Sequence, residues 1–359
     1  MPGTAVLFQT HFLDTYSAAQ FARLRKSCPD DYYPFVLMHV SPGTPKPAPL
    51  LNLPHHFVTT SEIRDPNYTG KSDGGPEWRI WAGGHTDLPV LHFFNDHPEF
   101  EAYWIMEYDV RFTGSWATLF RNFEGAADLA TTNLRRRPGH PDWHYWDTLR
   151  PPPYYSGQRP TWPIPEADQI SGFMPIYRVS ARAMRMMDQL YRRGWTGHIE
   201  VTWPTLLRES GLTIEDFGAH GEFTRESNWG RHYSSNPTTG SFAPGSFVWR
   251  PSKWWVGLRP NRLVHPVKPL RATIKEHWWS ARRQIITILR ANAGRASPKR
   301  RRFFGREGAQ DQLPPRSIVD AFVREPRRRA GDYLAAHRST VSSIVGQRSL
   351  RLNRLPHSR

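Results

Sequence analysis

The chain has 359 residues and a formal net charge of +16, and the excess charge lies in residues 271–359, which hold 21 Lys and Arg against 6 Asp and Glu. Its single cysteine, Cys28, excludes an internal disulfide framework, and no apolar run approaches the roughly 18 residues of a membrane span. Because the N-terminus also lacks a secretory signal pattern, we expect a cytoplasmic protein, or one that is peripheral to the inner face of the membrane.

The first residues of the chain predict a βαβ unit. The apolar run 4–10 is typical of a buried strand, and apolar residues recur at helical spacing in 15–28, behind Asp14 or Thr15 as the helix cap. Residues 32–40 form a second strand-like run. A strand, a helix and a strand in this order imply a parallel sheet with a right-handed crossover.

The core is organised around an aromatic and β-branched run that begins at Ala102 and ends on two acids, Glu107 and Asp109. The run predicts a buried strand, and if the strand continues through Asp109, its pleat places both carboxylates on one face. Two acids at one strand end are costly to bury unless a hard divalent cation, such as Mn²⁺ or Mg²⁺, compensates them. Alternatively, the acids pair with Arg111 or cap the helix that is predicted after Gly114.

A second pair of polar residues lies further along the chain. Residues 171–179 predict a strand, and Ser180 begins a predicted helix. We expect the segment 197–205 to be extended, so that His198 and Glu200 share a face just ahead of an amphipathic stretch. By position alone, Glu200 could merely cap the following helix.

Two long polar segments are predicted to be loops. Residues 135–169 are rich in Arg, Pro, Trp and Tyr, whose rings could stack on a sugar or a nucleobase or could pack among themselves. Residues 228–245 are rich in Gly, Ser and Asn and suit a lid over a ligand. Three histidines shortly before the acid pair match no common metal-ligand spacing, so we expect them to be scattered; they are His85, His92 and His97.

The acid pair resembles the metal-binding Asp-x-Asp signature of GT-A-fold glycosyltransferases, with Glu107 in the first position. The wider pattern from Trp104 to Gly114 resembles a sparsely characterised group of glycosyltransferase-like proteins from fungi and bacteria. The resemblance implies a GT-A-like three-layer α/β/α sandwich around a mainly parallel sheet, over residues 3–270. Residues 271–359 would then be a basic, partly helical C-terminal extension.

The same resemblance implies a role for each residue of a donor site that binds a nucleotide diphosphate sugar. Gln9 and Thr10, at the end of the first strand, would lie near the base or ribose, and Glu107 would order the ribose or a metal-bound water. The remaining donor-site residues are the metal ligands Asp109 and His265 and the phosphate-facing Lys268. Alternatively, Gln9 and Thr10 only complete hydrogen bonds at a strand end, and His265 is a surface residue before a proline.

The resemblance also implies an acceptor side. An acid in the region of Glu200 serves such enzymes as general base or as a ligand of the acceptor hydroxyl, and the acceptor would be a glycan or a lipid-linked acceptor. The extension begins with a helical pattern in which Trp278, Trp279, Ile285, Ile286 and Leu289 fall near one face, with arginines opposite. Such a helix could lie on an anionic membrane or pack on the core.

Two other classes of function fit parts of the sequence. The basic extension and the aromatic loop would suit a nucleic-acid or anionic-polymer binding protein, but no nucleic-acid motif is present, so we expect no specific nucleic-acid partner. A metal-dependent hydrolase could use His198, Glu200 and Asp109, but these residues have no ligand spacing of a known type. The sequence therefore favours a metal-dependent glycosyltransferase.

Overall fold

The structure is a computed structural model that describes residues 3–73, 78–80, 83–125, 127–152, 164–234, 245–249 and 252–295. Contacts group Met1–Ala291 into one compact unit, to which the following description applies. Parts of the predicted aromatic loop and of the predicted lid lie outside the described residues, as do the basic runs of the extension. Within the described residues, no helix is long and apolar enough to cross a bilayer.

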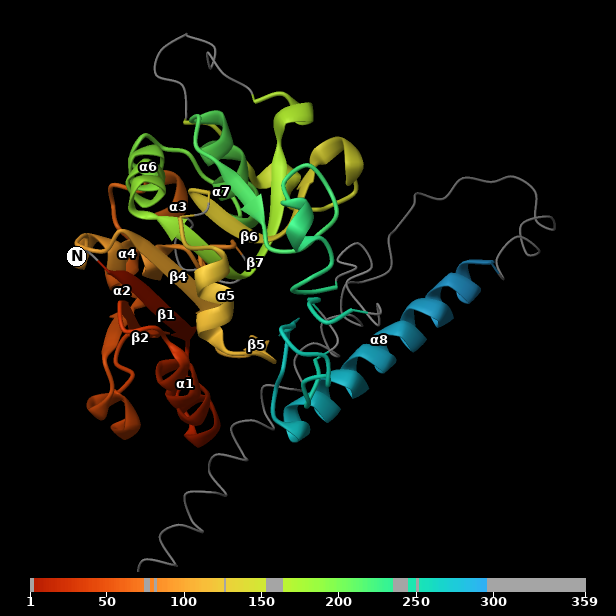
Figure 1. The fold of residues 1–359 in the computed structure, drawn as a ribbon. Helices are drawn as coiled ribbons and strands as arrows, with labels where there is room; N and C mark the ends of the chain where they lie inside the picture. The colour runs from red at the N-terminus through yellow and green to blue at the C-terminus, as the bar shows by residue number, and fades with distance from the viewer. Residues whose placement is uncertain are drawn as a thin grey trace, which may run out of the picture. The chain divides into compact units, whose positions relative to one another are not determined.

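A mainly parallel sheet forms the centre of the fold (Figure 1). Among the described residues it has seven strands in the order β3-β2-β1-β4-β7-β6-β8, and only β7 runs antiparallel to its neighbours. The strands are β1 Thr4–Thr10, β2 Tyr32–Val40, β3 His55–Thr59, β4 Ala102–Glu107, β6 Leu129–Arg136, β7 Ile170–Ser180 and β8 Ile214–Asp216. Two short strands, β5 Arg111–Phe112 and β9 Leu263–Val264, form a separate antiparallel pair. The expected α/β fold with a mainly parallel sheet is confirmed.

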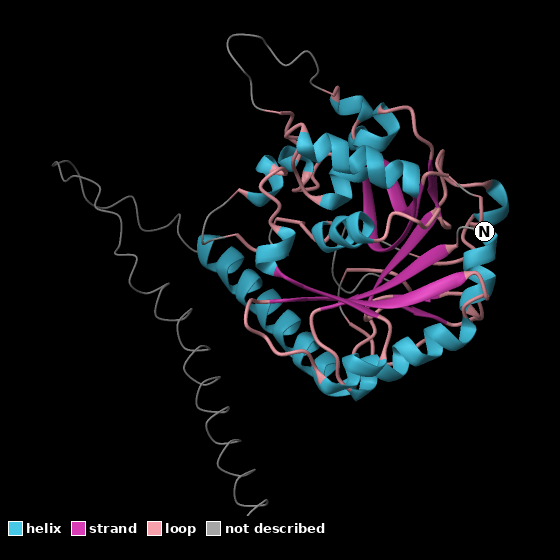
Figure 2. Ribbon diagram, turned by 90° about the vertical axis from the view of Figure 1, so that its left-hand side faces the viewer, coloured by secondary structure: helices cyan, strands magenta, loops and turns pink. Residues whose placement is uncertain are grey.

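Helices cover both faces of this sheet (Figure 2). The helices are α1 Thr15–Ser27, α2 Thr60–Ile63, α3 Thr69–Ser72, α4 Leu88–Asp96, α5 Trp116–Asn122, α6 Ala181–Arg192, α7 Ile199–Glu209 and α8 Leu270–Arg295. The pleat of β1 sends Ala5 and Leu7 into the core beneath α4, α6 and α7, and sends Val6 and Phe8 into the core beneath α1 and α5. Two cores on opposite faces of one sheet make the three layers.

The βαβ unit at the start of the chain forms as predicted. The Asp14 side chain accepts a hydrogen bond from the Ser17 backbone N–H, and the Ser17 side chain accepts one from the Asp14 backbone, so that a capping box starts α1. Phe21 and Leu24 are the buried apolar residues of this helix. Strands β1 and β2 pair in parallel, which requires the crossover that α1 supplies.

The prediction of an extended segment at 197–205 was wrong. The segment begins α7 instead, because the His198 side chain accepts a hydrogen bond from the Glu200 backbone N–H and caps the helix. A run of buried residues through Leu207 follows, since α7 is covered on nearly all sides by the sheet and its neighbours. A segment that is buried on nearly all sides has no clear helical period in its sequence, so the sequence does not distinguish a buried helix from a buried strand here.

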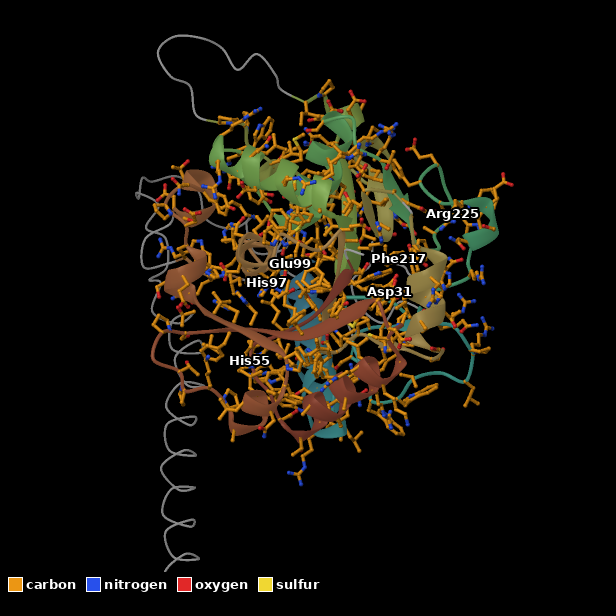
Figure 3. All side chains as sticks on the ribbon, turned by 60° about the vertical axis from the view of Figure 1, so that its left-hand side comes forward. Asp31, His55, His97, Glu99, Phe217 and Arg225 are labelled. Carbon is orange, nitrogen blue, oxygen red and sulfur yellow. The ribbon has the colours of Figure 1, made fainter. Side chains whose placement is uncertain are left out.

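The chain after β8 closes the core on the side of α5. Figure 3 shows Phe217 inside the molecule and Arg225 further out. The Phe217 ring stacks on Trp104 of β4, with ring centroids 5.5 Å apart. The Arg225 guanidinium lies over the Phe123 ring and donates a hydrogen bond to Glu215. These contacts hold the residues after β8 against the centre of the sheet.

Candidate functional site

The two acids lie on a tight turn at the carboxyl end of β4. The strand ends at Glu107 rather than continuing through Asp109, because the Val110 backbone N–H donates to the Glu107 carbonyl at 3.0 Å and closes a turn. The Arg111 guanidinium holds this turn by donating to the backbone carbonyls of Tyr108 and Val110, at 2.6 and 2.7 Å. The N-cap of α5 is Ser115, so neither acid caps that helix. Both acids therefore project from a braced turn.

A backbone ladder brings His265 to this turn. Strand β9 pairs with β5, with Val264 opposite Arg111, and the Val267 N–H donates to the Asp109 carbonyl at 2.8 Å. The His265 Nε2 atom consequently lies 3.6 Å from a carboxylate oxygen of Glu107 and 3.6 Å from Oδ1 of Asp109. One ligand atom from each of the three side chains lies within 4.8 Å of the others.

The donor atoms of this cluster fit a divalent cation. His265 Nδ1 lies 2.8 Å from the Val248 carbonyl, which can only accept, so Nδ1 carries a proton and Nε2 is the ring nitrogen that faces the acids. Asp109 is 3 % exposed, and its Oδ1 is buried without a hydrogen-bond partner. A buried carboxylate oxygen in that state is stabilised by a hard cation.

Charges around the cluster agree with this fit. Burial raises the pKa of Asp109, although the nearby imidazole of His265 opposes that effect. Burial lowers the pKa of His265, but the carboxylates of Asp109 and Glu107 more than offset this and leave it raised. Lys268 Nζ lies 3.7 Å from Asp109 Oδ2, at the edge of the cluster. Two acids thus face one lysine and a histidine whose proton a divalent cation would displace.

The cluster forms part of the wall of a cavity of about 720 Å³, a volume typical of small-molecule sites. Five of the predicted site residues line this cavity: Glu107, Asp109, Glu200, His265 and Lys268. They come from β4 and its turn, from the first turn of α7 and from the segment after β9. The carboxyl end of a strand in an α/β sheet is where such folds bind their ligands.

Gln9 and Thr10 are not among the residues that line the cavity. The Gln9 side chain donates to the Thr86 carbonyl at 2.7 Å, and the Thr10 hydroxyl donates to the Phe12 carbonyl at 2.6 Å. Among the described residues that line the cavity are instead His11 and Thr86. The end of β1 therefore reaches the cavity one residue later than predicted, and Gln9 positions a neighbouring loop.

Glu200 faces the cavity from the first turn of α7. His198 caps the helix, so the alternative in which Glu200 is the N-cap is wrong. Its Oε1 accepts from the Met174 N–H at 3.4 Å, and its Oε2 lies 3.7 Å from His198 Nδ1. Burial raises the pKa of Glu200 to about 8, and burial lowers the pKa of His198 to about 3. A carboxyl group with such a pKa gains and loses its proton near neutral pH.

Aromatic side chains of the predicted loop complete the wall beside Glu200. Tyr145 stacks on His198 with ring centroids 3.9 Å apart, and Trp143 lies edge-on to the same imidazole. Trp146 is buried and donates through Nε1 to the His140 carbonyl. The described part of the loop therefore both packs on itself and presents rings to the cavity.

The three histidines that were expected to be scattered do not gather into one site. His85 stacks on a tryptophan and His97 packs on a phenylalanine. His92 instead lies beside two residues that the sequence pattern did not indicate as its neighbours. His92 Nδ1 lies 2.9 Å from His56 Nε2 and 3.5 Å from Asp96 Oδ2. These three side chains form a second group that could hold a metal ion. It was missed because His56 lies on β3 and the other two on α4.

The comparisons with known proteins are limited in extent. The family described as "Protein of unknown function (DUF3405)" matches residues 67–137, a stretch that includes the acid pair. No curated protein matches the sequence.

Two solved structures resemble parts of the chain at low similarity. Mouse xyloside xylosyltransferase 1, in its apo form, is similar at 14 % identity and a TM-score of 0.33, over 60 % of this chain and 85 % of that one. A putative glucose-1-phosphate thymidylyltransferase from Bacillus anthracis, in complex with a sucrose, is similar at 9 % identity and a TM-score of 0.32, over 60 % and 87 %. At these TM-scores the description of the fold rests on the strand order and the two cores alone.

Proposed function

We propose that the chain is a metal-dependent glycosyltransferase that moves a sugar from a nucleotide diphosphate sugar to a glycan or a lipid-linked acceptor. The observation that carries this proposal is the convergence of Glu107, Asp109 and His265 on a cavity that Glu200 also lines. The resemblance of the acid pair to the Asp-x-Asp signature supports the same class. The fold alone would not support this class of enzyme, because proteins with unrelated chemistries share folds.

On the donor side, Asp109 and His265 would hold the divalent cation, which is manganese or magnesium in this proposal. When bound, that cation supplies Lewis-acid stabilisation of the negative charge on a departing diphosphate. Glu107 would order the ribose, and Lys268 would add a positive charge for the phosphates from the edge of the cluster. The turn braced by Arg111 keeps the acids in place before the donor arrives.

On the acceptor side, Glu200 would act as the general base. It would take the proton of an acceptor hydroxyl as that oxygen bonds to the anomeric carbon and the bond from that carbon to the diphosphate oxygen breaks. The raised pKa of about 8 keeps the carboxylate basic enough for this transfer. Trp143 and Tyr145, beside Glu200, offer ring faces and edges against which a sugar could pack.

We also propose that the basic extension draws the protein to an anionic membrane surface on the cytoplasmic side. Residues 271–359 hold 21 Lys and Arg against 6 Asp and Glu. Each such cation contributes on the order of 1 kcal/mol near an anionic leaflet, and the attraction fades as salt increases.

A thermal-shift screen of nucleotide diphosphates, each with and without manganese, tests the proposed function. A ligand that binds only the folded state raises the melting temperature by mass action. We expect one nucleotide diphosphate to raise it only when manganese is present, and Asp109→Asn to remove that effect. If no nucleotide changes the melting temperature, or if one does so equally in the Asp109→Asn variant, the proposal is wrong.

A further inference from the structure

Helix α8 turns an apolar stripe outward. Leu270, Ile274, Trp278 and Ile285 are 52, 60, 58 and 57 % exposed, respectively. Their spacings of four, four and seven residues place them along one side of an α-helix. The expectation that Trp278 and Ile285 share a face agrees with this spacing, and neither side chain is buried against the core.

The side of α8 that contacts the protein is polar. Thr273 is buried, the Ser252 hydroxyl donates to Glu276 at 2.6 Å, and His277 Nε2 lies 2.9 Å from the Ser252 carbonyl. A surface helix of a soluble domain ordinarily turns its apolar stripe toward the core and its polar side toward water. The described part of α8 has the reverse arrangement, which exposes apolar side chains to water and is therefore unfavourable in free energy.

A loop beside α8 exposes more apolar surface. Trp254, Trp255 and Leu258 are 58, 52 and 99 % exposed, and they lie shortly after Ser252, which bonds to α8. We call the tryptophan surface the set formed by this loop and by the stripe of α8. Each of the two segments exposes several large apolar side chains, whereas single exposed apolar residues are normal on a soluble protein, and such groups commonly mark an interaction site.

The cations around the tryptophan surface point to an anionic bilayer as its partner. Arg271, Lys275 and Arg282 are exposed on α8, and Arg259 follows the loop. The Arg282 guanidinium also lies over the Trp278 ring, at 5.7 Å from its centroid. Tryptophans with arginines and lysines beside them are typical of helices that lie in the headgroup region, where rings insert and cations meet lipid phosphates.

We propose that the tryptophan surface inserts into the headgroup region of an anionic bilayer, so that the acceptor of the transfer is lipid-linked. The claim that the acceptor is lipid-linked rests on the proposed function and on the position of α8, whose inward side faces the cavity and whose outward side carries the apolar stripe. Glu276, on the inward side of α8, lines the cavity together with Lys268, and the two side chains lie 3.8 Å apart. A bilayer that contacts the outward side of α8 therefore lies one helix away from the cavity.

Co-sedimentation of the full chain with vesicles tests the surface. The vesicles are of phosphatidylcholine alone or of phosphatidylcholine mixed with phosphatidylglycerol, at low and at high salt. We expect binding to the mixed vesicles that weakens but persists at high salt. Two double variants each remove two exposed apolar side chains, at least one of them a ring, without touching the core. They are Trp254→Ser combined with Trp255→Ser, and Ile274→Ser combined with Trp278→Ser. Each should lower the high-salt binding roughly tenfold or more, since burying one large apolar side chain is worth at least that factor.

The matched control is Tyr33→Ser, which removes a ring of similar exposure, 47 %, from the amino end of β2. It should bind vesicles as the parent protein does. The surface proposal is overturned if the parent protein does not bind the mixed vesicles, or if the ring variants retain its high-salt binding. It is also overturned if the parent protein prefers single-stranded RNA to the mixed vesicles at equal salt.

The acceptor class has its own test, with labelled sugar donors of the nucleotide diphosphate that the thermal-shift screen identifies. A glycolipid extract in vesicles and the same sugars without lipid are offered as acceptors. We expect label to enter the lipid fraction, and the ring variants to raise KM for the vesicle acceptor while kcat stays near that of the parent protein. Transfer only to lipid-free sugars would overturn the lipid-linked acceptor. Absence of any transfer would count against the proposed function, while the vesicle binding above still decides the surface.

Discussion

His265 Nε2 lies 3.6 Å from Oδ1 of Asp109, and the proton on its other ring nitrogen is directed to a backbone carbonyl. The two residues are far apart in sequence, and the β5–β9 ladder together with one hydrogen bond from Val267 brings them together. An imidazole nitrogen and a buried carboxylate oxygen without a hydrogen bond, placed this close together, are suitable ligands for one divalent cation. This relationship is the basis of the account of the site.

Replacing Asp109 by Asn should abolish manganese-dependent nucleotide binding and leave the fold intact. The substitution removes a ligand charge, but it also removes a buried charge whose desolvation opposes folding. We therefore expect a native far-ultraviolet circular dichroism spectrum and an unchanged or higher melting temperature in the absence of metal. His92→Ala, which disrupts the second group of ligands, is the control and should bind nucleotide normally. Unfolding of Asp109→Asn would show that the acid holds the turn together instead.

Glu200→Gln should slow turnover much more than it weakens donor binding. A general base acts on the acceptor in the transition state, so its loss should lower kcat by roughly 100-fold or more. Nucleotide affinity, measured by thermal shift, should remain close to that of the parent protein. The nearby Glu209→Gln, at the far end of the same helix, is a matched control and should be active. Full activity in Glu200→Gln would assign the base to another group.

The raised pKa of Glu200 also predicts a pH dependence of stability. Between its ordinary value of 4.5 and about 8, the folded protein retains a proton that the unfolded chain has lost. The free energy of unfolding should therefore fall as pH rises through this window, because the folded state binds more protons. The glutamine of the Glu200→Gln variant cannot ionise. The melting temperature of this variant should therefore rise relative to that of the parent protein as the pH increases from 4.5 to 8. A constant difference across that range would mean that the carboxyl titrates normally.

Truncation after Ala291 should preserve nucleotide binding but reduce the attraction to anionic vesicles at low salt. The deleted part carries most of the excess positive charge, whereas the retained part of α8 keeps Glu276 in the cavity wall. Binding to mixed vesicles by the truncated chain should depend less on salt than binding by the full chain. Loss of nucleotide binding on truncation would show that the extension contributes to the active site.

The parts of the fold that local pattern determines were predictable. Strand β1, the Asp14 cap and strand β2 depend on periodicity and on one side chain near each boundary. Helix α7 was not predictable, because it is buried on almost all sides and its apolar run has no helical period. The end of β4 at Glu107 depends on a turn hydrogen bond that sequence spacing does not reveal.

The candidate site also has residues that could be predicted from the sequence and residues that could not. The acid pair is adjacent in sequence and could be found by pattern, and resemblance to a family suggested His265 and Lys268. The aromatic wall at Tyr145 and the histidine pair of β3 and α4 depend on segments that meet only in the folded chain. Local pattern carries no information on such contacts, so these residues could not be assigned from the sequence alone.

The most direct test of the account is the release of nucleoside diphosphate from a panel of nucleotide diphosphate sugars, measured with manganese and with a chelator in its place. We expect release from at least one donor in manganese, its loss with the chelator, and its loss in Asp109→Asn and in His265→Gln. Tyr33→Ser should release the product at the rate of the parent protein. Release that continues with the chelator, or that is unchanged in both site variants, would contradict a metal-dependent transferase centred on Asp109 and His265.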